Sequence, residues 1–262
     1  MISKVIPSIF LLCLVAVLFA PVEASNSDIA KEGRWAEQVE DGLLDGDVVW
    51  LDDGKGQQFL GVLTEGDVDS GRAVLLVHGI GVHPNWPDVI YPLRAGLLEE
   101  GITSLSIQMP ILANEADSAA YAPLFVEVPG RIDAAISSLQ EAGFNNVTLV
   151  AHSMGASMAV YYQAQVQANR IDSLVIIGMS SGLDGQENID RLRQLKLPVL
   201  DLYGEADLPA VLSSTAQRAA AGEAAESDYR QQRVAGANHF FQGHESALVQ
   251  SVLDWLAAQS SP

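Results

Sequence analysis

The stretch that decides the fold is Val147-Thr-Leu-Val-Ala-His-Ser-Met-Gly-Ala156. Its first four residues are mostly β-branched and follow a Gly-Phe-Asn-Asn turn, which predicts a short buried strand. A helix is expected from about residue 154 to about residue 169. Ser153 stands on the turn between the two, and the small residues beside it allow the backbone to bend sharply. Such a turn lifts the Ser153 hydroxyl above the carboxyl end of the strand and leaves the N–H of Met154 free at a helix N-terminus.

Short apolar strands alternate with amphipathic helices through the rest of the chain. After two strands at 48–51 and 58–63, further strands are expected at 73–77, 102–107, 174–177, 199–202 and 229–234, with helices at 35–44, 88–100, 131–142, 188–196, 210–221 and near the end. Continuous apolar strands, each followed by a helix, are typical of a parallel sheet covered on both faces. The tight Asp-Asp-Gly-Lys-Gly turn between the first two strands predicts an antiparallel edge. No internal repeat or linker divides the chain, so residues 25–262 are expected to form one domain.

This layout resembles the α/β-hydrolase fold from about residue 47 to the end, and the turn at Ser153 resembles that family's nucleophile elbow, G-x-S-x-G. Ala151 stands where the motif has its first glycine. The resemblance implies a serine hydrolase that cleaves an ester or thioester through an acyl-enzyme. It also implies little or no cap domain, because only about twenty residues separate the strand at 174–177 from the next one. We expect residues 114–129 to wall the pocket instead.

A serine hydroxyl needs a histidine to accept its proton, and the histidine needs a carboxylate to hold its tautomer. In α/β hydrolases the chain order is serine, acid, histidine. Only His239 and His244 follow Ser153 in the sequence. His239 lies between the last expected strand and the last helix, where the family places its base, and is therefore the expected base. His244 is expected to cap the last helix or to face solvent.

The acid is expected to be Asp207. It follows the strand at 199–202 in Leu-Tyr-Gly-Glu-Ala-Asp, which resembles the family's strand-then-G-x-x-D turn. Glu205 is the nearest alternative, and Asp184, after the preceding strand, is the next. Asp201 lies inside the strand and is expected to be buried or paired.

The oxyanion hole of an acyl-transfer enzyme needs two backbone donors. Met154 supplies one. The other is expected to be the N–H of Ile80, since Val77-His-Gly-Ile-Gly81 resembles the family's His-Gly-x-Gly loop. His78 and His152 are expected to be structural, each bonded to the backbone near the elbow.

The first residues resemble a secretory leader. Lys4 gives a short positive region, residues 6–20 are an apolar run, and Val22-Glu-Ala24 is an A-x-A-like cleavage site. We predict a signal peptide over residues 1–24, a mature chain from Ser25, and a periplasmic location, with secretion as the alternative. An uncleaved anchor is the other reading, but the run is shorter than the ~20 residues that a membrane span needs.

The formal net charge of −19 excludes whole classes of partner. An acidic surface repels nucleic acid and anionic lipid, so neither is expected, nor is stable membrane insertion after cleavage. The histidines lack the spacing of a metal site, and neither a metal nor a cofactor is expected. Cys13, the only cysteine, lies in the leader, so the mature chain has no thiol. The expected partner is a small-molecule acyl ester, and the oligomeric state stays open.

Two further segments, 82–92 and 107–111, look more specific than the fold requires. Together with the leader and the elbow they resemble an exported bacterial family of α/β-hydrolase-like proteins of unknown function, which implies a compartment and a fold but no substrate. A rival to the enzyme is therefore a binding or assembly protein that keeps the fold without the activity.

Overall fold

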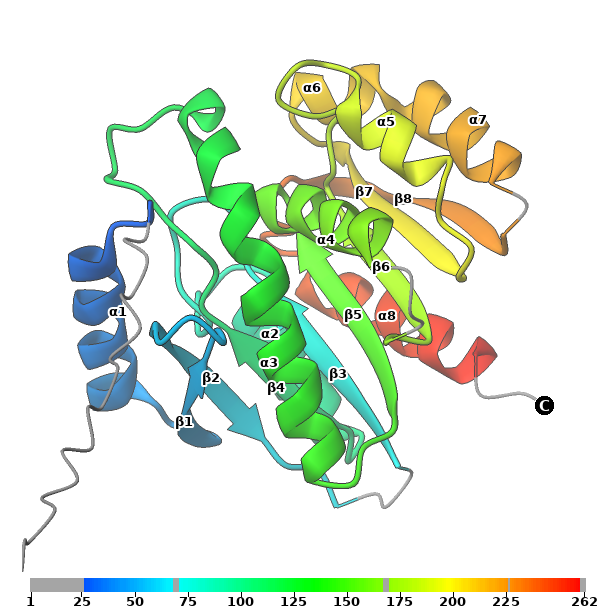
Figure 1. Cartoon of the computed structure of the whole chain (residues 1–262). Helices are drawn as coiled ribbons and strands as arrows, with labels where there is room; N and C mark the ends of the chain where they lie inside the picture. Colours follow the sequence, from blue (N-terminus) through cyan, green and yellow to red (C-terminus); the bar gives the residue numbers. More distant parts are fainter. Residues whose placement is uncertain (1–25, 68–70, 167–169, 226, 260–262) are drawn as a thin grey trace, which may run out of the picture.

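The computed structural model describes residues 26–67, 71–166, 170–225 and 227–259, and the signal peptide expected at 1–24 lies outside them. Their framework is one eight-stranded sheet of order β1-β2-β4-β3-β5-β6-β7-β8 (Figure 1). Its strands are β1 (Asp47–Asp52), β2 (Gln58–Thr64), β3 (Arg72–Val77), β4 (Thr103–Ile107), β5 (Asn146–His152), β6 (Ser173–Ile177), β7 (Val199–Ala206) and β8 (Tyr229–Asn238). β1 and β2 form the antiparallel edge, and β3 to β8 run parallel. The α/β-hydrolase fold predicted from the sequence is confirmed.

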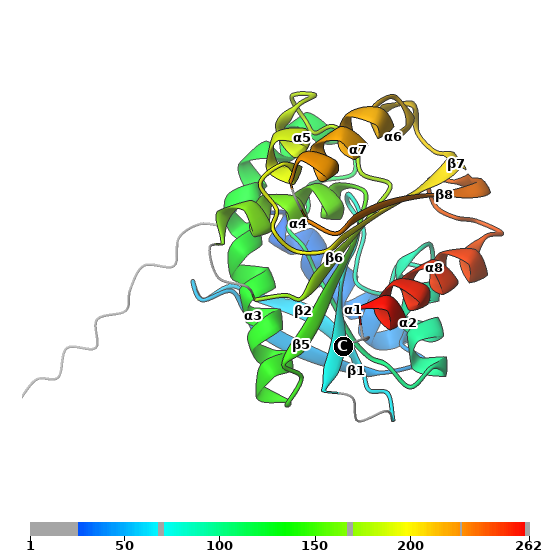
Figure 2. The same cartoon turned by 90° about the vertical axis from the view of Figure 1, so that its right-hand side faces the viewer.

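Helices cover both faces of the sheet. They are α1 (Ile29–Gly42), α2 (Ile90–Glu99), the 3-10 helix η1 (Ser118–Glu127), α3 (Val128–Glu141), α4 (Met154–Gln165), α5 (Glu187–Leu192), α6 (Pro209–Ser213), α7 (Thr215–Ala224) and α8 (Glu245–Ala258). Figure 2 shows α3 and α4 on one side of the strands and α2 and α8 on the other. Only α5 and short connections stand between β6 and β7, so no cap is inserted there.

The apolar run of β3 explains the two layers. Successive side chains of a strand point to opposite faces. Leu75 and Val77 therefore pack with α3 and α4, while Val74 and Leu76 pack with α2 and α8. A strand that buries both faces has no polar alternation, which is why its sequence predicts a central parallel strand.

Two helices differ most from their predictions, while α4 and α5 each end about four residues earlier than expected. The first begins at Ile29 rather than at residue 35, because the Asp28 carboxylate accepts the Lys31 N–H at 2.9 Å and caps it. The single helix predicted at 210–221 is two, α6 and α7. Ser214 stands between them, and its hydroxyl bonds to the carbonyl oxygens of Ala210 and Val211, which competes with a continuous helix. Within the described part of the chain, none of the helices has the length and apolar character needed to cross a membrane.

Candidate active site

Ser153 stands on a strained turn at the carboxyl end of β5. Its backbone has φ 57° and ψ −119°, a conformation rare for a residue with a side chain. The N–H of Ser153 is held by the Ile177 carbonyl at 2.8 Å. Gly155 must be a glycine, because a Cβ there would overlap the carbonyl oxygen of His78. α4 starts at the next residue, so Ser153 stands between the end of β5 and the start of α4.

The three side chains expected to form a triad meet at this edge. The Nε2 atom of His239 lies 2.9 Å from Ser153 Oγ, and its Nδ1 atom lies 2.6 Å from Asp207 Oδ1. An ionised Asp207 accepts a hydrogen bond only, so Nδ1 carries the ring proton and Nε2 is left to accept the Ser153 hydroxyl proton. This is the arrangement in which an imidazole takes a proton from serine.

Asp207 is buried and fully bonded. Besides His239, it accepts the N–H groups of Gly204 at 3.1 Å and Leu208 at 2.7 Å. Burial alone would raise the pKa of Asp207, but the hydrogen bond and the charge of His239, together with the two backbone donors, outweigh it and hold that pKa below its ordinary value. The carboxylate therefore stays ionised and holds the histidine in one orientation.

The other carboxylates that the sequence offered lie elsewhere. Glu205 is half exposed, forms an ion pair with Arg233 at 3.3 Å and accepts the N–H of Gly236. Asp184 caps the exposed start of α5, where it accepts the N–H of Glu187 at 2.9 Å. Asp201 is fully buried and bonded to Arg218 at 2.7 Å. None of the three contacts a histidine through a described hydrogen bond.

The loop after β3 approaches the serine closely. A Cβ on Gly79 would lie 3.3 Å from Ser153 Cβ, so the backbone of this loop passes directly beside the nucleophile. Ile80 follows it, with 37% of its surface exposed. Met154, the first residue of α4, presents an N–H that has no partner within the helix. These are the two backbone groups that the sequence nominates as oxyanion donors.

His78 holds this loop in place. Its Nδ1 donates to the Gly79 carbonyl at 2.7 Å, and its Nε2 accepts the N–H of Met109 at 2.9 Å. Burial lowers the pKa of His78 to about 3, so the ring stays neutral. Gln108 lies 3.0 Å from the same Nε2. The contribution of Gln108 and Met109 was missed, although the segment 107–111 was already noted as unusually specific.

His152 holds the loop that carries His239. Its Nε2 donates to the carbonyl oxygen of His239 at 3.0 Å, and the two rings lie 4.8 Å apart. Burial, with a smaller contribution from His239, lowers the pKa of His152 to about 3. His244 occupies the N-cap position of α8, but its side chain does not cap the helix and bonds to the Gln242 carbonyl instead.

Helix α1, which lies outside the strand–helix alternation, contacts the loop after β3. The indole Nε1 of Trp35 donates to the Gly81 carbonyl at 3.3 Å. The Trp35 ring also packs on His83 at 4.9 Å and edge-on to Trp86 at 6.1 Å. This contact was missed, because it joins residues 46 positions apart and only the tertiary structure brings them together. The available signal in the sequence was a tryptophan in an otherwise polar segment.

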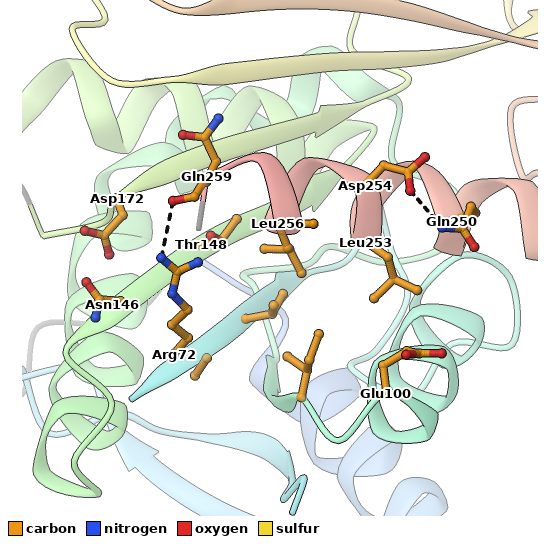
Figure 3. Close-up of a pocket in the computed structure, with 14 residues that line it drawn as sticks. Arg72, Glu100, Asn146, Thr148, Asp172, Gln250, Leu253, Asp254, Leu256 and Gln259 are labelled. Atoms are coloured by element: carbon orange, nitrogen blue, oxygen red, sulfur yellow. Dashed lines mark hydrogen bonds between the residues drawn. The ribbon is translucent and has the colours of Figure 1, made fainter. Parts of the chain in front are cut away.

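A cavity of about 610 Å³ lies at the opposite end of the molecule (Figure 3). It opens where β3 and β5 begin and where α8 ends, and Arg72 donates there to the Gln259 carbonyl at 3.2 Å. A second cavity, of about 440 Å³, lies beside α1. Neither is lined by Ser153, Asp207 or His239. Open α/β sheets bind substrates outside the carboxyl ends of their strands, so the candidate site is the edge at Ser153.

The segment expected to wall the site, 114–129, forms η1 and the start of α3. Phe125 of this segment packs edge-on against Tyr161 of α4 at 5.3 Å, which holds η1 against the helix that Ser153 begins. Among the residues with described positions, no three histidine, cysteine, aspartate or glutamate side chains are grouped so that they could hold a metal ion.

Comparison with known proteins agrees with this fold. A family model described as a protein of unknown function, DUF3530, matches residues 21–124 and 114–258. No curated protein matches the sequence. Among solved structures, the chain is similar to Est1E from Butyrivibrio proteoclasticus, with 12% identity, a TM-score of 0.64, and coverage of 82% of this chain and 99% of that one.

Two further structures are similar over most of their length. A dienelactone hydrolase from Anabaena variabilis shares 22% identity with a TM-score of 0.66, covering 82% of this chain and 97% of that one. The esterase Pf2001 from Pyrococcus furiosus shares 13% identity with a TM-score of 0.67, covering 84% and 95%. At these identities the likeness shows a shared fold and nothing more.

Proposed function

The chain belongs to the DUF3530 family, and from its α/β-hydrolase fold and the geometry at Ser153 we propose that it is a serine hydrolase that cleaves an ester or thioester. The observation that carries the proposal is the continuous hydrogen-bond chain from Ser153 Oγ through His239 to Asp207, at 2.9 and 2.6 Å. Nucleophile, base and orienting carboxylate come from the ends of three different strands, and all three positions are filled.

The proposed reaction proceeds through an acyl-enzyme. Ser153 Oγ attacks the carbonyl carbon while Nε2 of His239 takes its proton, and the carbonyl oxygen gains the negative charge. The N–H groups of Ile80 and Met154 hold that oxygen. His239 then gives its proton to the departing alcohol or thiol as the C–O or C–S bond breaks. A water molecule, deprotonated by the same Nε2, attacks the acyl-enzyme. The bond between the acyl carbon and Ser153 Oγ then breaks as His239 returns the proton to Oγ, and the acid leaves.

Electrostatics around His239 favour this cycle. When His239 holds the serine proton it is positively charged, and Asp207 lies within hydrogen-bond distance to stabilise it. The neighbouring ring of His152 stays neutral, because burial has lowered its pKa to about 3. It therefore adds no second positive charge 4.8 Å from the imidazolium.

A fluorophosphonate probe tests the nucleophile on the purified mature protein. Wild-type protein should be labelled at Ser153 and should hydrolyse short p-nitrophenyl esters, whereas Ser153→Ala should lose both. Loss of a triad serine removes most of the rate enhancement and leaves roughly 10³–10⁴-fold over water. Ser213→Ala, in an exposed position on α6, is the matched control and should keep both.

The rival proposal is a non-catalytic binding or assembly protein with the same fold. Wild-type protein that is folded by circular dichroism, but neither reacts with the probe nor turns over any ester or thioester, would favour it. Labelling that persists in Ser153→Ala would move the chemistry to another residue.

We further propose that the chain is exported and cut after Ala24. The support is the leader-like sequence, in which Lys4 and an apolar run at 6–20 precede the A-x-A-like site Val22-Glu-Ala24. Intact mass of the periplasmic protein should correspond to a chain that begins at Ser25. Full-length protein recovered in the membrane fraction would mean that the leader is an anchor.

A further inference from the structure

Exposed apolar side chains gather at the catalytic edge. Among the described residues, six large apolar side chains are exposed, and four of them lie between the end of a parallel strand and the start of the next α-helix. These four, which we call the apolar rim, are Ile80, Val126, Leu208 and Phe240, exposed to 37%, 58%, 47% and 42%. The other two, Leu44 and Trp50, lie after α1 and on the edge strand β1. Scattered exposed apolar residues need no explanation, but a group at one end of the sheet does.

The topology brings the rim to the same edge as Ser153. Ile80, Leu208 and Phe240 come two or three residues after the ends of β3, β7 and β8, and Val126 comes two residues before α3. All of these strands run parallel to β5. Carboxyl ends of parallel strands meet at one edge, and Figures 1 and 2 both place η1 and α6 at this end of the molecule.

Each rim residue is attached to a part of the site. The Phe240 ring stands edge-on to His239 with centroids 5.1 Å apart. Leu208 donates its N–H to Asp207. Ile80 follows the glycine that passes beside Ser153, and Val126 follows the phenylalanine that packs on α4. Three rim residues therefore adjoin the candidate site directly in the chain, and Val126 adjoins a residue that packs on the helix after Ser153.

We propose that the apolar rim binds the long acyl chain of the ester that Ser153 cleaves. This inference rests on the proposed hydrolase function and specifies its substrate class. A chain bonded to the carbonyl under attack must leave the site across the loops that carry the rim, because the sheet closes the space below. There it removes from water the apolar surface that the free protein exposes. Each methylene group that becomes fully buried increases binding by about fourfold.

The occupant is the chain of a single substrate molecule. A net charge of −19 opposes docking onto an anionic lipid surface. A protein partner seated on the rim would cover Ser153, and no substrate could then reach it.

The test is the ratio of kcat/KM for a dodecanoyl ester to that for an acetyl ester of p-nitrophenol, both below their aggregation concentrations. The wild-type ratio should exceed 10. Phe240→Ser and Leu208→Ser should each lower it about fivefold, because each removes apolar surface from the chain's path. Leu44→Ser, which removes an exposed leucine far from the site, is the matched control and should leave the ratio unchanged. Equal melting temperatures would show that the variants fold.

A binding readout separates this inference from the proposed chemistry. In Ser153→Ala, a fluorescent dodecanoyl ester should bind measurably, and Phe240→Ser in the same background should weaken its binding about fivefold. If short esters are cleaved and kcat/KM does not change with acyl chain length, the proposed role of the rim is wrong and the proposed hydrolase function stands. Rates that rise only above the aggregation concentration would assign the rim to a lipid surface instead. If the protein binds the dodecanoyl chain but cleaves no ester, the rim binds acyl chains as proposed and the proposed hydrolase function is wrong.

Discussion

The conformation of Ser153 is possible only because its neighbours are small or bonded to the turn. A residue with a side chain at φ 57° carries backbone strain, which persists where the surrounding structure enforces it. Here Gly155 leaves room for the His78 carbonyl, and the Ile177 carbonyl holds the Ser153 N–H. The alanine at 151 is tolerated because that residue lies inside β5, paired with Val77 and Ile176, and not on the turn itself.

The identity of the acid can be tested at single residues. Asp207→Asn should lower ester turnover by up to ~10⁴, because an amide no longer holds the productive tautomer of His239. Glu205→Gln changes a half-exposed carboxylate that pairs with Arg233 and accepts the N–H of Gly236, and Asp184→Asn changes one that bonds the start of α5. Neither carboxylate contacts His239 through a described hydrogen bond, so each change should alter turnover less than twofold. The assay is p-nitrophenyl acetate hydrolysis, with circular dichroism to match folding. Loss of activity in Asp184→Asn alone would transfer the role to the β6 connection.

At the scale of elements, α1 is the part of the molecule that lies outside the strand–helix alternation. It is fastened by a buried ion pair, in which both terminal nitrogens of Arg131 bond to Glu32 at 2.9 and 3.0 Å. The Arg131 side chain is completely buried. Burial raises the pKa of Glu32, and the nearby Arg131 opposes that shift. A pair so placed is sensitive to the loss of either partner.

Glu32→Gln should therefore destabilise the protein strongly. It leaves the Arg131 charge buried with only Glu127, 3.8 Å away, as a described carboxylate partner. Loss of one partner of a buried pair costs about 3–5 kcal/mol, measured as the free energy of unfolding in urea. Asp190→Asn breaks the exposed pair with Arg193 and should cost less than about 1 kcal/mol. Similar losses in the two variants would contradict the fastening role of the buried pair.

Under the proposed function, the contact between α1 and the loop after β3 makes Trp35 a positioning residue. Trp35→Phe removes the hydrogen bond to the Gly81 carbonyl and keeps an aromatic ring beside His83. Since the oxyanion is bound most strongly in the transition state, kcat should fall roughly threefold to tenfold with little change in KM. Trp50→Phe, on the exposed edge strand, is the control. A rise in KM at constant kcat would instead place Trp35 in substrate binding.

At the scale of the whole molecule, buried histidines make stability depend on pH. Burial lowers the pKa of His78 and His152 to about 3 and that of His83 to about 4, from 6.5 in the unfolded chain. As the pH falls below 6.5, the unfolded chain binds protons that the folded chain does not. Stability is therefore complete above pH 6.5 and is lost as the pH falls toward the folded values.

Each such histidine should add up to about 1.4 kcal/mol per pH unit to the slope of stability against pH. Urea unfolding between pH 6 and 5 should show this slope. His83→Gln should reduce it by about one histidine's share, whatever its effect on stability at pH 7. An unchanged slope in His83→Gln would mean that this ring is protonated in the folded state.

The sequence by itself determined the architecture and nominated the members of the candidate site. Apolar runs without alternation, each followed by an amphipathic helix, are buried on both faces only in a parallel sheet with helices on both sides. The order of the elements then places Ser153, Asp207 and His239 after the ends of their strands, at one edge. Helix boundaries were less predictable where local hydrogen bonds intervene, as at Asp28 and Ser214.

Only the tertiary structure decided the features that depend on contacts between distant residues. Glu205 and Asp207 are two residues apart in the same acidic turn, and only the extension of β7 to Ala206 and its register with β8 direct Asp207 to His239. The approach of Trp35 to Gly81 rests on one hydrogen bond and the pairing of Glu32 with Arg131 on two, and both join segments far apart in the sequence. Such contacts leave no periodic pattern in a sequence, because each depends on the packing of whole elements and not on the spacing of residues.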